Sequence, residues 1–325
     1  MATQPVTSAK RRQIFAVLEE TARSVQRLHE PALRKMLPVL RQAHEELEDQ
    51  LRRWLSRENG ESAFTTQRYR NAITHVRHAM ATIKRSAPEI EDALWESADI
   101  AGRLSTSNIV RELEAFGRIF EGTIQPVNLD AAAVIAQGEK VLWKQFESSA
   151  RRYAGSIGEG LIQELAVSRA KSETIFEVTN RLQRRMPAIF AGDRWKAERL
   201  ARTEVMNAYA ETHLQGLKEI QEDDPEIVAR WDASFDRRRC PACASLDGQV
   251  RDVANGEKFV AEWISKRKVG VRRHRKIVEK PPLHPACRCV VTTWRSTWAM
   301  VARKTAALPA PPPPIALPAA ARARP

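Results

Sequence analysis

From Ile14 to about Ile220, hydrophobic residues recur at the three- and four-residue spacing of amphipathic helices. Breaks in this pattern predict helix ends at Pro31, at Asn59-Gly60, near Ser86-Ala87-Pro88 and at Gly155, Gly158 and Gly160, with a loop over 122–128. The polar run 105–108 indicates one further interruption. Asp130 and Asp193 are placed to cap two of the later helices. The pattern therefore predicts a mainly α-helical N-terminal body.

After Pro225 the pattern changes to a looser alternation over 227–235, which predicts a strand. A tight Cys-x-x-Cys turn follows, and Asp247-Gly248 is a strong hairpin-turn signal. The predicted organisation is an all-α body at 1–189, a small α+β domain with a Cys/His knuckle site at 190–304, and a disordered Pro/Ala-rich tail at 305–325.

Composition agrees with a folded protein of about two domains, at roughly 150 residues per domain. The chain has 325 residues, of which 43% are hydrophobic and 29% charged, so wholesale disorder is excluded. No apolar run approaches the ~20 residues needed to span a bilayer, and the N-terminus has no apolar secretory segment. We therefore expect neither a membrane association nor a signal peptide.

The charge is concentrated near the C-terminal end. Residues 1–235 hold 34 Lys and Arg against 34 Asp and Glu, whereas residues 236–325 hold 19 against 6, which accounts for the whole net charge of +13. The candidate binding residues are Lys266, Arg267, Lys268, Arg272, Arg273, Arg275, Lys276 and Lys280. They form either an ordinary solvated surface or an electrostatic contact with nucleic-acid phosphate or an acidic protein.

All four cysteines lie in the same basic region, as Cys240, Cys243, Cys287 and Cys289, and His284 precedes the second pair. Two thiols separated by two residues can reach one metal ion, and a second pair completes a tetrahedron. Five candidate ligands compete for four positions, and their softness favours a structural Zn²⁺. A disulfide between the pairs and four inert thiols are the alternatives.

A polar stripe precedes the cysteine region. Helical spacing places Thr203, Glu204 and Asn207 along one face, with Arg202 beside them. On the sequence alone this stripe is either a solvated helix face or a packed polar motif.

Several of these features together resemble the phage Mu protein F-like head morphogenesis family, which includes the SPP1-type minor capsid proteins. The motifs that carry the resemblance are Arg202-Thr203-Glu204 with Asn207, Trp231, Cys240-Pro241-Ala242-Cys243, Leu246-Asp247-Gly248-Gln249-Val250 and the run from Pro281 to Cys289. The resemblance covers about 190–294 and implies that Arg202, Thr203, Glu204, Asn207, Trp231, Asp247 and Gly248 form a structural polar motif.

The resemblance also implies a minor head protein of a tailed phage or prophage. Such a protein associates with the portal vertex and assists procapsid assembly and DNA packaging or delivery. Its candidate partners are the portal protein, the scaffold or major capsid protein, and phage DNA. It is expected in the bacterial host cytoplasm during assembly and then in the virion head.

Enzymatic activity is not expected. The chain has no His-Glu pair with metalloenzyme spacing, no Gly-rich phosphate loop and no Gly-x-Ser-x-Gly motif. A zinc-dependent nucleic-acid-processing enzyme of prophage origin, such as a nuclease or toxin, is the alternative. A transcription factor would need a basic recognition helix, but here the basic residues fall in a region that resembles a loop.

Overall fold

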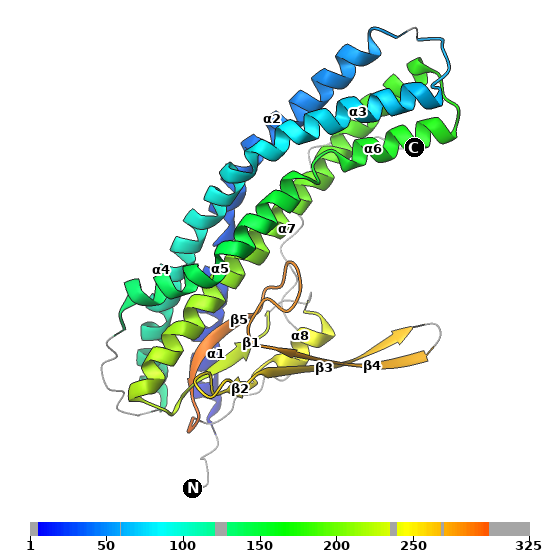
Figure 1. Ribbon diagram of the computed structural model, residues 1–325. Coiled ribbons are helices and arrows are strands. Elements are labelled where there is room, and N and C mark those ends of the chain that lie inside the picture. Colours follow the sequence, from blue (N-terminus) through cyan, green and yellow to red (C-terminus); the bar gives the residue numbers. More distant parts are fainter. Residues whose placement is uncertain (1–5, 59, 121–128, 235–238, 268–269, 299–325) are drawn as a thin grey trace. The chain divides into compact units, whose positions relative to one another are not determined.

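The computed structural model describes residues 6–58, 60–120, 129–234, 239–267 and 270–298 (Figure 1). The helices are α1 (Ser8–Gln26), α2 (His29–Leu55), α3 (Thr66–Ile83), the 3₁₀ turn η1 (Lys84–Ser86), α4 (Ala87–Phe120), α5 (Ala131–Ala154), α6 (Glu159–Ala170), α7 (Ile175–Asp223) and α8 (Pro241–Leu246). The strands are β1 (Ile227–Asp232), β2 (Val250–Arg251), β3 (Phe259–Arg267), β4 (Gly270–Val278) and β5 (Val290–Arg295). The predicted helical body followed by a small sheet region is confirmed. The predicted tail lies outside the described residues.

The chain divides into two compact units, each built from separate segments. Among the described residues, unit 1 combines those of 6–29, 96–143 and 202–298, whereas unit 2 combines those of 30–95 and 144–201. Three dividing points fall inside α4, α5 and α7, and another follows the first residue of α2. The boundary predicted after residue 189 also falls inside α7, and the predicted domain limits stay a prediction.

Most helix ends follow the sequence signals. The chain breaks between α1 and α2 and places Pro31 in the first turn of α2, where a missing N–H costs little. Asp130 accepts hydrogen bonds from the backbone N–H groups of Ala132 and Ala133, both at 3.1 Å, and so caps α5. Gly158 has a φ of 88° at the start of α6, a conformation that glycine adopts readily.

The predicted interruption at 105–108 is wrong, because α4 continues through it. The Thr106 hydroxyl donates to the Arg103 carbonyl at 3.0 Å, and the Asn108 amide donates to the Tyr209 hydroxyl at 3.1 Å. Hydrogen bonds satisfy these two buried polar side chains inside the packed helices.

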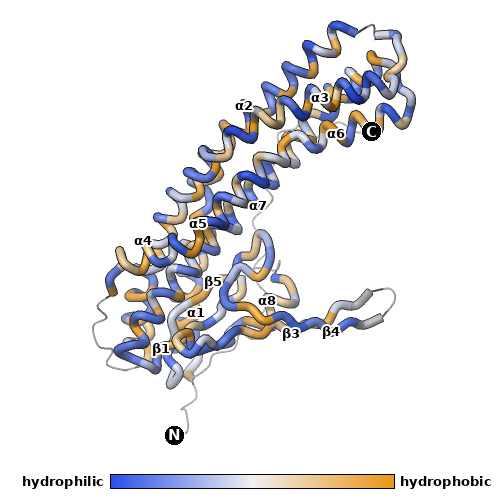
Figure 2. Tube along the Cα trace, viewed as in Figure 1, coloured by the Kyte–Doolittle hydropathy of each residue, from blue (hydrophilic) through white to orange (hydrophobic). Residues whose placement is uncertain are grey.

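Asp193 does not cap a helix, which corrects a second prediction. It lies inside the continuous α7, where its carboxylate accepts from the His44 ring at 3.0 Å, from Lys196 at 2.9 Å and from the Gly158 N–H at 3.2 Å. Burial opposes ionisation, but these hydrogen bonds lower the pKa of Asp193 overall. The residue therefore links α2, α7 and the α5–α6 turn within unit 2. Figure 2 shows hydrophilic and hydrophobic positions interleaved along these helices.

Within the described residues, unit 1 contains a sheet of order β2-β1-β5 and a separate β3–β4 ribbon. All β1 pairings are antiparallel, with Ala229 opposite both Arg251 and Thr293. Trp231 and Trp294 are fully buried in the core of this unit. Asp247-Gly248 is not a two-residue hairpin turn as predicted. Gly248, with a φ of 80°, instead joins α8 to β2.

A buried polar cluster joins the sheet to the helices of unit 1. The Glu112 carboxylate accepts from the Thr293 N–H at 2.7 Å and from the Thr21 hydroxyl at 2.8 Å. Burial raises the pKa of Glu112 to about 7, and burial also lowers the pKa of the neighbouring His213 to about 3. His213 Nε2 lies 3.2 Å from the Thr293 hydroxyl and 3.9 Å from the Glu112 carboxylate. Sequence periodicity gave no sign of this cluster.

Candidate metal centre

The first ligand pair is positioned by the N-terminus of a helix, not by the predicted tight turn. Cys240 caps α8, its Sγ accepts the Cys243 N–H at 3.3 Å, and Pro241 occupies the first turn. A capping residue and the third residue of a helix lie on the same side of its first turn. The local fold therefore brings both sulfurs to one place before any metal binds.

The second set of ligands comes from the segment before β5. His284 Nε2 lies 3.4 Å from Cys240 Sγ and 3.3 Å from Cys243 Sγ. Cys287 Sγ lies 3.8 Å from Cys243 Sγ. A tetrahedral zinc ion places neighbouring sulfur and nitrogen ligands about 3.5–3.8 Å apart, given its usual bond lengths. These three separations are close to the ligand spacing of a tetrahedral zinc site.

The five predicted ligands form two overlapping sets of three that share Cys243. One set is Cys240, Cys243 and His284, and the other is Cys243, Cys287 and Cys289, with the ligand atoms of each set within 4.8 Å of one another. Such a Cys/His cluster can hold a metal ion.

His284 is oriented for coordination by its other ring nitrogen. Nδ1 lies 3.0 Å from the Pro285 carbonyl, to which it donates in the tautomer that leaves the Nε2 lone pair for a metal. Although burial opposes protonation, this backbone contact and the nearby thiols raise the pKa of His284.

Two thiols of the cluster, Cys240 and Cys287, are favoured in the ionised form. Hydrogen bonds from Cys243 and Cys289 lower the pKa of Cys287 far below its usual range, although burial opposes this shift. Burial also opposes ionisation of Cys240, but the Cys243 N–H lowers the pKa of that thiol. Hydrogen bonds to Cys287 and Cys289, together with burial, raise the pKa of Cys243 far above its usual range, so this ligand must lose its proton when a metal binds.

The polar stripe of α7 contacts the ligand loop directly. The Thr203 hydroxyl accepts the Ala286 N–H at 3.0 Å, and Ala286 has a φ of 57°, which is uncommon for a residue other than glycine. Because Ala286 lies between His284 and Cys287, Thr203 holds the turn that spaces these two ligands. The sequence offered no signal for this contact.

The other stripe residues are packed as well. Glu204 and Asn207 are buried, at 5% and 6% exposure. Arg202 Nη2 lies 3.2 Å from the His29 ring. Burial, followed by the nearby charge of Arg202, lowers the pKa of Arg288 in the ligand loop. The stripe therefore lies within unit 1 and is not a solvated helix face.

Asp247 connects the short helix to the end of β1. Its carboxylate accepts from the Ala233 N–H at 2.9 Å and from Arg239 at 3.1 Å. The Gly248 N–H donates to the Trp231 carbonyl at 2.8 Å. These bonds fix the helix that carries Cys243 against the strand that carries Trp231.

The basic residues lie mainly on the β3–β4 ribbon, whereas the sequence indicated a loop-like region. Arg272, Arg273, Arg275 and Lys276 are exposed. Lys268 and the side chains of Lys266 and Arg267 lie outside the described part of the chain. Lys280 does not join the exposed set, because its side chain is mostly buried and pairs with Glu211.

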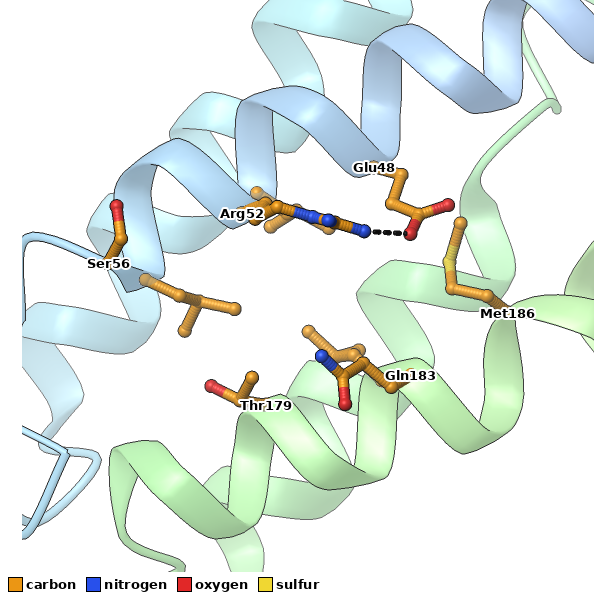
Figure 3. Close-up of a pocket in the computed structure, with 9 residues that line it drawn as sticks. Glu48, Arg52, Ser56, Thr179, Gln183 and Met186 are labelled. Carbon is orange, nitrogen blue, oxygen red and sulfur yellow. Dashed lines mark hydrogen bonds and ion pairs between the residues drawn. The ribbon is translucent and has the colours of Figure 1, made fainter.

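A pocket separate from the candidate metal centre lies in unit 2 between α2 and α7. It has a volume of about 190 Å³ and is lined by Glu48, Leu51, Arg52, Leu55, Ser56, Thr179, Leu182, Gln183 and Met186 (Figure 3). Its charged pair, Glu48 and Arg52, is joined at 2.7 Å along one helix. None of the residues predicted for the functional site lines it.

Comparison with known proteins finds a match to one family over part of the chain. Residues 162–292 match the family model described as Phage Mu protein F like protein, which confirms the resemblance seen in the sequence. The match contains every candidate metal ligand and supports a phage head morphogenesis protein. Among curated proteins and solved structures no match is found. In the described segments, no helix is both long and apolar enough to cross a membrane.

Proposed function

We propose that the protein is a minor head protein of a tailed phage or prophage, acting in head morphogenesis at the portal vertex. The observation that carries this proposal is the Cys/His cluster assembled inside the segment that matches the family. The role is structural and non-enzymatic. During assembly the protein is in the bacterial host cytoplasm, and afterwards it is in the virion head.

The cluster holds one zinc ion through Cys240, Cys243, His284 and Cys287. Three separations of 3.3–3.8 Å, from His284 to Cys240 and Cys243 and from Cys243 to Cys287, support this set, as does the orientation of the His284 ring. Cys289 is buried, and its sulfur lies within 4.8 Å of those of Cys243 and Cys287 as the fifth candidate ligand. A site filled by four protein ligands is typical of structural zinc, whereas hydrolytic zinc keeps one position open.

Metal content tests this part of the proposal. Protein purified under reducing conditions should contain about one zinc per chain, and a strong chelator should lower its thermal stability. Replacement by Co²⁺ should give the absorption bands of a tetrahedral ion bound to thiolate. A metal-free protein that keeps its stability in chelator would exclude a structural zinc site.

The portal is the proposed principal partner, and co-purification with the portal of the same phage is the test. Charge reversal at Arg272, Arg273 and Arg275 should weaken association, and added salt should have the same effect. Reversal at Arg12, Arg41 and Lys218, which are exposed elsewhere, is the matched control. A wild-type protein that binds none of portal, scaffold and major capsid protein would contradict the proposed function.

The same basic residues could also attract phage DNA. An electrophoretic mobility shift of duplex DNA that weakens with added salt measures that contact.

A further inference from the structure

The five candidate ligands form two layers that differ in their exposure to solvent. The outer layer is the set Cys240, Cys243 and His284, in which Cys240 is partly buried and His284 is exposed. The inner layer is the set Cys243, Cys287 and Cys289, whose side chains are only 1–3% exposed. An ion bound by the four zinc ligands therefore leaves one buried sulfur of the inner layer, that of Cys289, without a metal.

The local fold explains why three sulfurs meet in the inner layer. Cys243 lies in the first turn of α8. Cys287 and Cys289 are both buried in the segment that leads into β5, whereas Arg288 between them is more exposed. This alternation places the two cysteine side chains on the same side of the segment. Their sulfurs therefore face that of Cys243, which lies 3.8 Å from the Cys287 sulfur.

The inner layer offers a different set of donors from a structural zinc site. It supplies three sulfur atoms, whereas structural zinc takes four ligands in a tetrahedron. Cu(I) is a softer ion that prefers thiolates, and two or three of them satisfy it without a bound water. Because the three side chains are almost completely buried, water cannot readily complete the coordination of an ion there. The inner layer therefore suits Cu(I) better than a second zinc ion.

The charge balance permits a second ion beside the zinc ion. When Cys289 is protonated, a zinc ion bound by three thiolates and a neutral His284 ring carries one net negative charge. A monovalent ion that replaces the Cys289 proton leaves this charge unchanged. In that exchange a Cu–S bond forms, the S–H bond breaks and the proton passes to solvent, with no change of oxidation state. The buried centre thus gains an ion without gaining a charge, which its interior would disfavour.

We propose that the cluster has two metal positions, in which Cys243, Cys287 and Cys289 hold a Cu(I) ion beside the zinc ion. The two ions share the thiolates of Cys243 and Cys287, since a thiolate sulfur has enough lone pairs for both. The proposal rests on the proposed function only for the zinc ion in the outer position. Cys289 belongs to the inner layer alone, and the inner position therefore depends on it.

Two matched cysteine variants separate the two positions. Wild type, Cys289→Ser and Cys240→Ser are purified with zinc under anaerobic reducing conditions, incubated with the bicinchoninate complex of Cu(I), desalted and analysed for both metals. The wild type should hold about one zinc and about one copper per chain, and should release about one proton for each copper bound. Cys289→Ser should keep its zinc and bind no copper. Cys240→Ser loses an outer ligand only, and it should still bind about one copper.

A spectroscopic measurement on the wild type does not depend on the folding of a variant. Cu(I) bound by thiolates luminesces in the visible region when the site is shielded from water, and contact with water quenches the emission. The copper-loaded wild type should therefore luminesce, because the inner layer is only 1–3% exposed. Circular dichroism will verify that both serine variants fold as the wild type does.

Three results would overturn the second metal position. They are the loss of one zinc for each copper that the wild type binds, equal copper binding by Cys289→Ser and the wild type, and copper loading without luminescence. None of them affects the zinc site of the proposed function, which the metal content before copper addition tests separately. If that content is zero, the outer position fails, and copper binding by the wild type and Cys289→Ser still tests the inner one.

Discussion

Replacing Glu112 with glutamine should change how stability depends on pH. In the folded protein burial raises the pKa of Glu112 from 4.5 to about 7. The folded state therefore keeps a proton that the unfolded chain releases above pH 4.5. The stability associated with this group is fully present below pH 4.5 and is lost as the pH rises to 7.

The magnitude follows from the size of the shift. Each unit of pKa difference corresponds to about 1.4 kcal/mol, so holding this carboxylate ionised above pH 7 costs about 3 kcal/mol. Glutamine cannot ionise, but its side-chain oxygen can still accept the Thr293 N–H. The pKa of His213 is lowered from 6.5 to about 3 by burial. The stability associated with that group is therefore lost as the pH falls, which is the opposite direction to Glu112. Its contribution is common to both proteins and cancels in their difference.

The assay is guanidinium unfolding of wild type and Glu112→Gln between pH 5.5 and 8, followed by tryptophan fluorescence. Trp294 and Trp298 pack on Phe116, one turn from Glu112, and report on this region. The free energy of unfolding of the variant, minus that of the wild type, should rise by about 2 kcal/mol from pH 5.5 to 8, with the curve levelling off above pH 7.

Glu20→Gln is the matched control for this measurement. Glu20 pairs with Arg111 beside the same cluster, but its side chain is 69% exposed. Its substitution should leave the pH dependence unchanged, because exposed pairs contribute little. A difference for Glu112→Gln that stays constant across the pH range would refute a raised pKa at this carboxyl group.

Three further predictions concern the metal centre and its support. Thr203→Val removes the acceptor for the Ala286 N–H and should weaken zinc binding about tenfold in chelator competition, whereas Thr203→Ser should not. Equal zinc affinities of Thr203→Val and the wild type would show that Thr203 does not support the site. Glu204→Ala should cost about 3–5 kcal/mol in thermal unfolding of the full chain, since a buried charge needs its partners, and an unshifted transition would count against this. Elemental analysis should find about one zinc per chain in Cys289→Ser and none in Cys243→Ser. The reverse result would make Cys289 a zinc ligand in place of Cys243.

Local signals predicted much of the fold, because they act over a few residues. The break near Pro31, the cap at Asp130 and the strand over Ile227–Asp232 each depend on neighbouring sequence. Asp193 shows where such signals fail, because its capping chemistry is used by His44, which lies 149 residues away. Tertiary contacts of this kind cannot be read from spacing.

The candidate site was predicted in its ligand types but not in its arrangement. The paired cysteines and His284 indicated a metal site, and the fold brings them together in two sets of three that share Cys243. The Thr203 contact to Ala286 joins residues 83 positions apart, so no local pattern reveals it. Likewise, Lys280 is one of a run of basic residues in the sequence, but only the fold shows that it pairs with Glu211.

The ribbon is inserted between the two halves of the ligand set, and this has a consequence for how such proteins can diversify. Cys243 precedes the ribbon and His284 follows it, while β3 and β4 pair with each other and not with the β2-β1-β5 sheet. A metal ion bound by these residues would therefore close the chain at the base of an arm whose length and sequence can vary. Doubling the length of such a closed loop adds only about 0.6 kcal/mol in closure entropy. A relative could exchange this arm for one of another length or charge, and so acquire a new partner, without rebuilding the centre that anchors it.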